Sequence, residues 1–133
     1  MKLDRRPRGT YKMDHRIAVL VVEDEALIRM EMVSELEDAG FKVFEAAHAD
    51  AAIEILIANL NIRVMFTDVD MPGGMDGLKL AAAVRDRWPP IKIIVTSGYQ
   101  TIDTKRLGVE GQFVKKPYNT RHVVQSINEM VGV

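Results

Sequence analysis

The stretch I-A-V-L-V-V-E-D-E, residues 17–25, decides the fold, because an uninterrupted apolar run ends abruptly in acidic side chains. Such a run, rich in β-branched residues, is typical of a strand that is covered on both faces, as the strands of parallel sheets are. Later apolar runs also end at a polar residue, namely Asp68, Thr96 and Lys116. Since the carboxyl ends of parallel strands open onto one edge of a sheet, we expect all these polar side chains to meet in one crevice.

Hydrophobic periodicity along the rest of the chain predicts strands that alternate with helices. The expected strands cover residues 17–22, 41–46, 64–68, 91–96 and 112–114. The expected helices cover residues 25–39, 49–58 and 78–88, a short segment within 101–107, and residues 120–131. Parallel strands need right-handed crossovers, and these strands need helices on both faces. The predicted fold is therefore α/β: a doubly wound, five-stranded parallel sheet of order 2-1-3-4-5.

The first helix shows the clearest pattern. Its acidic residues are expected in the first turn, and Gly40 supplies a stop at its C-terminus. Its apolar stripe, at helical spacing, consists of Ile28, Met32, Leu36 and Ala39. The last helix is expected to begin after Asn119, whose side chain can cap it.

Composition limits the class of protein. With 133 residues, of which 47% are hydrophobic and 28% charged, the chain has material for one compact domain, which we expect over residues 16–133. No apolar run approaches the roughly 20 residues of a membrane span, and no secretory signal is recognisable. Cysteine is absent, so disulfides and thiolate metal sites are excluded. A reducing compartment, the cytoplasm, is the expected location.

The N-terminal segment has its own charge. Residues 1–16 contain six basic and two acidic side chains, whereas the whole chain has a net charge of −1. We expect residues 1–15 to form a disordered tail. A basic arm could contact nucleic acid, but the chain shows neither a helix-turn-helix nor an aromatic platform, so we expect no direct nucleic-acid binding and no membrane binding.

The polar residues at the strand ends have the composition of a site for a metal ion and a phosphoryl group. Asp68 is the expected nucleophile, because a carboxylate can attack an activated phosphorus and form an acyl phosphate. Glu23 and Asp24 are expected to hold Mg²⁺, a hard cation that takes oxygen ligands. The Thr96 hydroxyl would donate a hydrogen bond to the phosphoryl group, and the Lys116 ammonium would face its oxygens.

Each segment also has an ordinary structural interpretation. Residues 23–25 could be only the acidic first turn of a helix, and residues 68–70 only a turn. Residues 96–98 are typical of a loop, and Lys115–Lys116 of a solvated pair. Together these interpretations are disfavoured, because carboxylates gathered at one sheet edge would repel one another by ~1 to 4 kcal/mol per close pair. Such a cluster implies a bound cation or a shifted pKa.

Four segments occur in a characteristic order: VVEDE (21–25), TDVDMPGGMDG (67–77), VTSGY (95–99) and FVKKPY (113–118). Together they resemble the signature segments of the receiver domain of two-component response regulators, and the resemblance covers the chain from about residue 16 to its end. It implies that Asp68 accepts a phosphoryl group from a histidine kinase or a histidine phosphotransfer protein. No enzymatic activity beyond self-catalysed phosphorylation and dephosphorylation is expected.

The resemblance also implies a full set of metal ligands. Asp68 and the main-chain carbonyl of Asp70 would join Glu23 and Asp24 around Mg²⁺. Pro117 would hold the turn after the last strand, following a peptide bond that is cis in the family.

The resemblance suggests two further roles, one in the conformational change that follows phosphorylation and one in docking of the protein that donates the phosphoryl group. After phosphorylation, the Thr96 hydroxyl would bond a phosphoryl oxygen and Phe113 would turn into the space that it leaves. The first helix carries more apolar surface than one buried face requires. Part of that excess, Leu27 and Met30, is expected to dock on the helical bundle that bears the donor histidine.

Some positions depart from the common family pattern. Glu23 stands where Asp is frequent, and its longer arm should still reach Mg²⁺. Gly73–Gly74 stand where many members have one glycine, which would only lengthen the turn. In the family, the positions of Asp70 and Gly98 influence how fast the acyl phosphate hydrolyses.

Alternatives remain open at this level. A strand followed by Asp68 and Asp70, with a later Thr and Lys, also resembles haloacid-dehalogenase-type phosphatases, although their metal-binding acids follow the lysine. A binding module that is never phosphorylated is a further alternative. Because nothing follows Val133, we expect a stand-alone receiver, monomeric or weakly dimeric, with an excised domain of a longer, for example DNA-binding, regulator as the alternative context.

Overall fold

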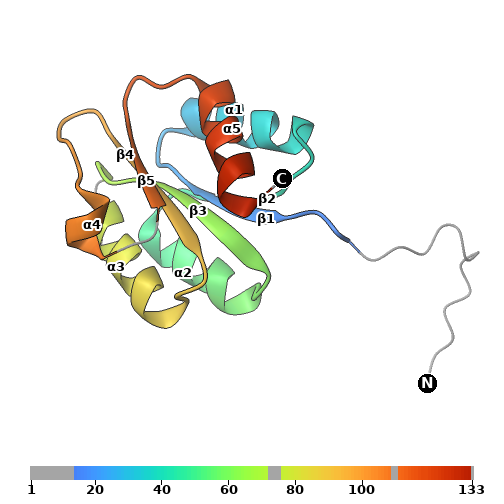
Figure 1. The fold of residues 1–133 in the computed structure, drawn as a ribbon, viewed down its shortest axis with the longest axis horizontal. Helices are drawn as coiled ribbons and strands as arrows, with labels where there is room; N and C mark the ends of the chain where they lie inside the picture. Colours follow the sequence, from blue (N-terminus) through green and yellow to red (C-terminus); the bar gives the residue numbers. More distant parts are fainter. Residues whose placement is uncertain (1–13, 72–75, 109–110, 133) are drawn as a thin grey trace, which may run out of the picture.

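A computed structural model of the chain describes residues 14–71, 76–108 and 111–132. Its strands form one parallel sheet of order β2-β1-β3-β4-β5, with helices on both sides (Figure 1). The strands are β1 (Ala18–Val22), β2 (Lys42–Ala46), β3 (Ile62–Asp68), β4 (Lys92–Ser97) and β5 (Gly111–Lys115). The helices are α1 (Ala26–Asp38), α2 (Ala49–Ala58), α3 (Gly77–Arg87), α4 (Thr104–Leu107) and α5 (Thr120–Val131). The predicted fold class and strand order are confirmed.

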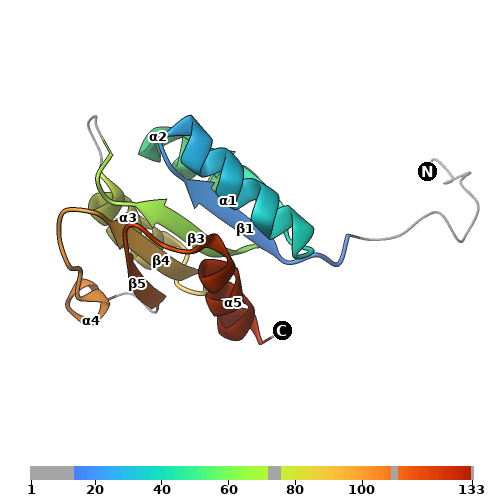
Figure 2. The same ribbon diagram turned by 90° about the horizontal axis from the view of Figure 1, so that it is seen from above.

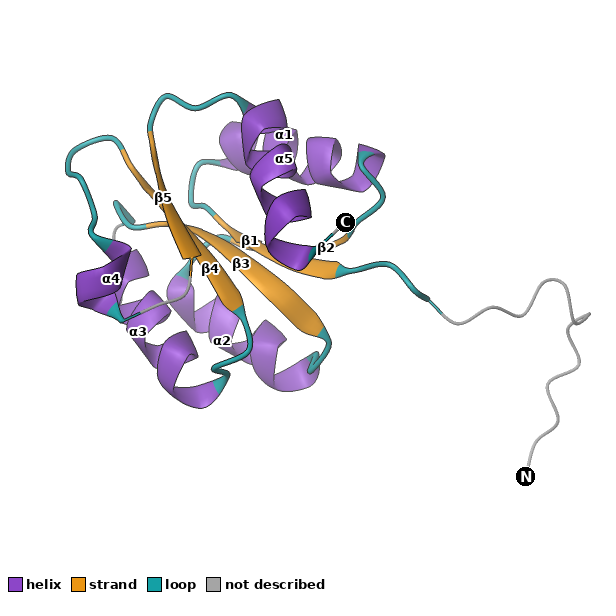
Figure 3. Cartoon of the chain, in the orientation of Figure 1, coloured by secondary structure: helices purple, strands orange, loops and turns teal. Residues whose placement is uncertain are grey.

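The molecule has three layers, with the sheet between two groups of helices (Figures 2 and 3). Helices α1 and α5 cover one face, where Met32 and Ile127 pack with Val21 and Phe66 of the sheet. Helices α2, α3 and α4 lie on the other face. The core there consists chiefly of Leu20, Val22, Ala52, Leu56, Met65, Leu80 and Val84. Neighbouring residues of β1 thus serve opposite faces, which explains why its sequence is apolar throughout.

Helix α1 differs from its prediction at both ends. It begins at Ala26, so that Glu25 is the residue before the helix and the first turn contains no acid. Met32 and Leu36 are buried as expected, but Ala39 is exposed and ends the helix instead of extending the stripe. Gly40 follows with a φ of +95°, a left-handed conformation in which glycine has no steric penalty.

Side-chain caps fix the starts of two helices near the carboxyl edge of the sheet. The Asp76 carboxylate accepts a hydrogen bond from the amide of Lys79 at the start of α3. The Asn119 side chain accepts one from the amide of Arg121 at the start of α5, as its position predicted. Both caps thus fix where the helices that follow β3 and β5 begin.

The N-terminal segment is described only from Asp14 onward. Residues 1–13, and with them most of the expected tail, lie outside the described residues, as do Gly73 and Gly74. Asp14 accepts hydrogen bonds from Arg16, which hold the pKa of this carboxyl well below its usual range. Among the described helices, none combines the length and apolar character needed to span a membrane.

Candidate functional site

Carboxylates from two central strands meet at the carboxyl edge of the sheet. Glu23 and Asp24 directly follow β1, and Asp68 is the last residue of β3. The structure brings these three together as predicted, since each offers an oxygen within 4.8 Å of the others. Glu23 and Asp68 are each only 1% exposed. The buried apolar strands thus deliver negative charge to a place from which water is largely excluded.

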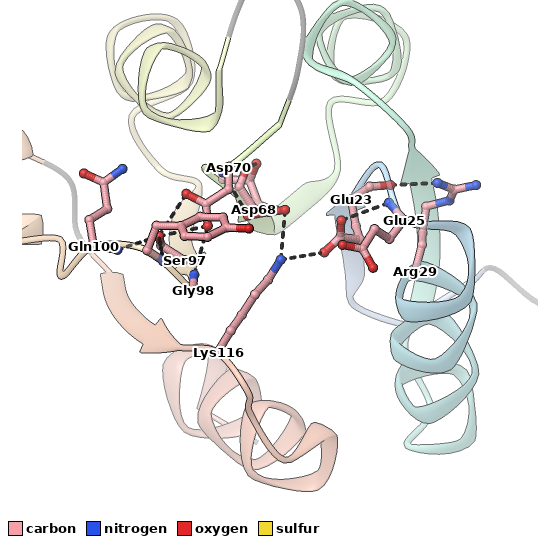
Figure 4. A network of polar contacts seen from close by, with 11 residues as sticks. Glu23, Glu25, Arg29, Asp68, Asp70, Ser97, Gly98, Gln100 and Lys116 are labelled. Atoms are coloured by element: carbon pink, nitrogen blue, oxygen red, sulfur yellow. Dashed lines mark hydrogen bonds and ion pairs between the residues drawn. The ribbon is translucent and has the colours of Figure 1, made fainter.

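Lys116, which follows β5, supplies the positive charge of the cluster (Figure 4). Its Nζ donates a hydrogen bond to Asp68 Oδ2 at 3.0 Å and lies 3.4 Å from Glu23 Oε1. Burial lowers the pKa of Lys116, but the hydrogen bond to Asp68 and the charge of Glu23 outweigh it and raise this pKa to about 12. The ammonium therefore stays charged at neutral pH. The peptide bond from Lys116 to Pro117 is cis, as the resemblance implied.

Burial is also the main influence on Glu23. It raises the pKa of this carboxyl to about 7, although the amide of Glu25, 3.0 Å from Oε2, favours the charged form. Glu23 Oε1 is buried and accepts no hydrogen bond from the described residues. A buried carboxylate oxygen without a hydrogen bond, beside Asp24 and Asp68, fits a hard divalent cation such as Mg²⁺.

The raised pKa of Glu23 predicts how stability depends on pH when metal is absent. Since the pKa rises from 4.5 to about 7, the folded protein binds more protons than the unfolded chain between these values. The contribution to stability is present below the lower value and lost as the pH rises through the higher one. We expect the free energy of unfolding to fall by about 1–3 kcal/mol over this range, measured by urea unfolding in a chelator. Glu23→Gln should flatten this dependence of the free energy of unfolding on pH. An equal slope in wild type and variant would contradict the assignment of the raised pKa to Glu23.

Thr96 is the neighbour of Asp68 in the register of β3 and β4. Its Oγ1 is buried and has no hydrogen-bond partner among the described residues. Such a hydroxyl has a donor to offer, and its residue is paired with Asp68 in the sheet; the role that the sequence predicts for it stays a prediction. Phe113 lies on β5, opposite Val95, and is half-buried. Whether this pair acts as a switch is not tested by these contacts and remains a prediction.

Asp70 has two different connections. Its amide donates a hydrogen bond to Asp68 Oδ1 at 2.9 Å. Its carboxylate turns to the end of β4, where it accepts bonds from Oγ of Ser97, the last residue of the strand, and from the amide of Gly98 (Figure 4). The expected role of its main-chain carbonyl as a metal ligand stays a prediction.

Sequence reasoning missed three residues of this region. Ser97 is fully buried and bonds Asp70, although Ser after Thr looked like loop chemistry. Arg29 Nη1 donates to the main-chain oxygen of Glu23 at 2.7 Å, which helps to fix the end of β1. The buried Tyr118 hydroxyl has no partner among the described residues, and burial raises its pKa to about 12. The positions of Arg29 and Tyr118, each close in sequence to a site residue, were the only available signal.

The expected docking residues lie on the surface of α1. Leu27 is 81% and Met30 60% exposed. Two large apolar side chains on one helix, next to the acidic cluster, form an exposed patch without a partner among the described residues. Their role in docking remains a prediction.

Comparison with known proteins agrees with this geometry. The family model of the response regulator receiver domain matches residues 19–128. An NtrX-like response regulator of Rickettsia bellii is 33% identical over 113 residues, 81% of this chain and 23% of that protein. The sensor kinase CckA of Brucella abortus is 34% identical over 117 residues, 85% of this chain and 12% of that protein. The chain therefore spans about a quarter or less of the length of these relatives.

Solved structures share the fold. A response regulator receiver protein from Pseudomonas putida has a TM-score of 0.78 and 30% identity, covering 88% of this chain and 99% of that one. A receiver protein from Sinorhizobium medicae has a TM-score of 0.80 and 25% identity, covering 90% and 97%.

The sheet order and the acidic edge define a doubly wound α/β domain with a cluster of carboxylates at the carboxyl ends of its strands. The chain belongs to the response regulator receiver domain family, whose members are signalling domains of two-component systems. The phosphatase alternative loses its basis, because the family match extends over most of the chain.

Proposed function

We propose that this receiver domain accepts a phosphoryl group on Asp68 from a histidine kinase or a histidine phosphotransfer protein. The observation that carries the proposal is the position of Asp68. This carboxylate is buried at the sheet edge, bonded to Lys116 and adjacent to two further acids. Phosphoryl acceptance requires a nucleophile, here the Asp68 carboxylate, and a positive charge that can face the oxygens of the incoming phosphoryl group.

The transfer step follows from these contacts. An Asp68 oxygen attacks phosphorus, a new O–P bond forms, and the bond from phosphorus to the donor breaks, with the electron pair leaving on the donor. The Lys116 ammonium stabilises the charge on the phosphoryl oxygens, and the free Thr96 hydroxyl donates to one of them. Glu23, Asp24 and Asp68, with the main-chain oxygen of Asp70, would hold Mg²⁺, which would neutralise the charge of the transferring group.

The signal is a change in packing. When Thr96 bonds the phosphoryl group, its side chain leaves the space that Phe113 then occupies, so a charge event at the site reaches the surface of β5. The unpartnered, buried state of the Thr96 hydroxyl supports this proposal, since no existing bond must break.

The experiment is intact mass spectrometry after incubation with acetyl phosphate. We expect an adduct of about 80 Da that is lost in base or hydroxylamine, as an acyl phosphate is. The adduct should require Mg²⁺ and should be absent in a chelator. Catalytic release of phosphate without an adduct would favour a phosphatase. No adduct and no release, even with kinases present, would favour the second candidate, a binding module.

The lifetime of the phosphoryl group should depend on Asp70. Its carboxylate lies two residues from Asp68 and is not one of the proposed metal ligands, so it could take a proton from attacking water, which an amide cannot do. We expect Asp70→Asn to slow decay of the adduct, on the order of tenfold, as measured by mass after removal of the donor. Asp76→Asn is a matched control, because this acid caps α3 instead of facing the site. An unchanged or faster decay in Asp70→Asn would refute the idea.

The exposed patch of α1 should govern transfer from the protein donor. We expect Leu27→Glu to slow transfer from a cognate kinase by on the order of tenfold, because a charge cannot be buried in an apolar contact. Labelling by acetyl phosphate, which needs no docking, should not change. Leu60→Glu is the control, since Leu60 is 83% exposed but precedes β3, at the other end of the sheet. If Leu27→Glu slowed labelling by the kinase and labelling by acetyl phosphate equally, docking at Leu27 would be excluded.

Whether this receiver works alone or as part of a longer regulator stays a proposal. A stand-alone receiver would signal through a protein partner, whereas a longer regulator would act on an attached output domain. The chemistry proposed for Asp68 is the same in both.

A further inference from the structure

A line of hydrogen bonds leads away from the acceptor carboxylate, through Asp70, to Ser97, a residue that the proposed transfer does not use. The amide of Asp70 holds Asp68 Oδ1 at 2.9 Å. The carboxylate of Asp70 is held in turn by Ser97 Oγ, at 2.9 Å from each of its oxygens, and by the amide of Gly98 at 2.9 Å. Asp70 thus connects the acceptor loop, residues 68–71, to the last residue of β4 and to the residue that follows it.

Ser97 continues this line into the loop between β4 and α4, residues 98–103. Its Oγ accepts hydrogen bonds from the amides of Tyr99 at 3.1 Å and Gln100 at 3.2 Å (Figure 4). One hydroxyl therefore donates to a carboxylate and accepts from two amides. Ser97 is fully buried, so no water competes for these bonds.

Such an arrangement is cooperative. A hydroxyl that donates to a charged acceptor becomes a stronger acceptor itself, and low exposure increases the effect. The amides of Tyr99 and Gln100 therefore sense the charge and position of the Asp70 carboxylate, although neither bonds it. The amide of Gly98 does bond it directly.

We propose that Ser97 is a positioning residue that couples the acceptor loop to the β4–α4 loop, so that a movement of Asp70 is passed to the amides of Tyr99 and Gln100. The Tyr99 side chain is 91% exposed, so the line ends on an aromatic that a partner protein can contact. Neither Thr96 nor Phe113 takes part in these bonds. The coupling itself stands on the contacts, whereas its use in signalling rests on the proposed function.

The test is amide hydrogen exchange, measured by NMR on the full chain. Four forms are compared: wild type, Asp70→Asn, Ser97→Ala and the double variant. In the wild-type background, Asp70→Asn should speed exchange at Tyr99 and Gln100 about threefold to tenfold, because Ser97 loses its charged acceptor. In the Ser97→Ala background, the same change should alter exchange there by less than about twofold.

Gly98 provides the internal control. Because its amide bonds Asp70 directly, exchange at Gly98 should respond to Asp70→Asn in both backgrounds. An equal response at Tyr99 in both backgrounds, or none in the wild type, would overturn the coupling. Ser97→Thr retains the hydroxyl and should retain the response, and the pair Ser97→Thr with and without Asp70→Asn repeats the test if the alanine variant folds poorly.

A second measurement separates the coupling from the proposed function. After treatment with acetyl phosphate and Mg²⁺, the amide signals of Tyr99 and Gln100 should shift in the wild type and at least twofold less in Ser97→Ala, with the adduct checked by mass in both. If these amide signals shifted equally in phosphorylated wild type and phosphorylated Ser97→Ala, Ser97 would have no part in transmitting the signal. Absence of the adduct would count against the phosphoacceptor proposal, while the exchange data would still decide the coupling.

Discussion

Asp68→Asn is expected to abolish the phosphoryl adduct formed with acetyl phosphate and Mg²⁺. The amide has nearly the same shape as the carboxylate but is a far weaker nucleophile, and it removes one charged oxygen donor from the metal cluster. The adduct should fall at least about a hundredfold, below detection by intact mass, because no other group in the structure is proposed to attack phosphorus.

Asp86→Asn is the matched control for this loss. Asp86 pairs with Arg85 on the exposed surface of α3, so the same chemical change there should leave the adduct intact. Thermal unfolding of Asp68→Asn should show a cooperative transition, which separates lost chemistry from lost fold. A persistent adduct on a folded Asp68→Asn protein would assign the acceptor to another residue.

Gly77→Ala is expected to have a large effect on stability. A methyl group at Gly77 would lie 2.1 Å from the main-chain oxygen of Asp68 and 2.6 Å from the Cα of Val69, atoms of the backbone that cannot rotate away. Helix propensity favours alanine by about 1 kcal/mol, but the clash forces α3 away from the end of β3. We expect a net destabilisation of roughly 2–3 kcal/mol, measured by urea unfolding.

Gly98→Ala tests whether this loss comes from the clash. The same methyl group there would meet the Lys116 side chain at 3.6 Å, which is ordinary contact. We expect a change in the free energy of unfolding below about 1 kcal/mol for this variant. Similar losses at Gly77 and Gly98 would mean that the clash with the backbone is not the cause, since the reduced backbone freedom of the unfolded chain would by itself stabilise both variants. Gly77→Ala should also slow labelling of Asp68, whose backbone it displaces.

Much of the fold was predictable because its central strands, β1, β3 and β4, are almost entirely buried. Their sequences are largely apolar and end where the polar edge begins, so the sheet and its order followed from simple rules. The start of β3 was missed: the structure places it at Ile62, two residues before the prediction. Arg63 interrupts the apolar run, but its side chain is exposed and so does not interrupt the strand.

The site was predictable where it depends on strand ends and not where it depends on loop conformation. Asp68 and Lys116 meet because parallel strands deliver them to one edge, and burial accounts for the shifted pKa of Glu23 that a carboxylate cluster implied. The bond between Asp70 and Ser97 joins the loop after β3 to the last residue of β4. No periodicity encodes the conformation of the loop that carries Asp70, so sequence reasoning had no means to find this contact.

The position of Lys116 has a consequence for biosynthesis. Many metal-binding domains fold only when their metal is supplied, because ligands of like charge repel one another until the ion arrives. Here the chain provides its own cation, which contacts Asp68 at 3.0 Å and Glu23 at 3.4 Å. A newly made chain can therefore reach its folded form before it meets Mg²⁺. In the proposed function, Mg²⁺ would then be needed for phosphoryl transfer but not for folding.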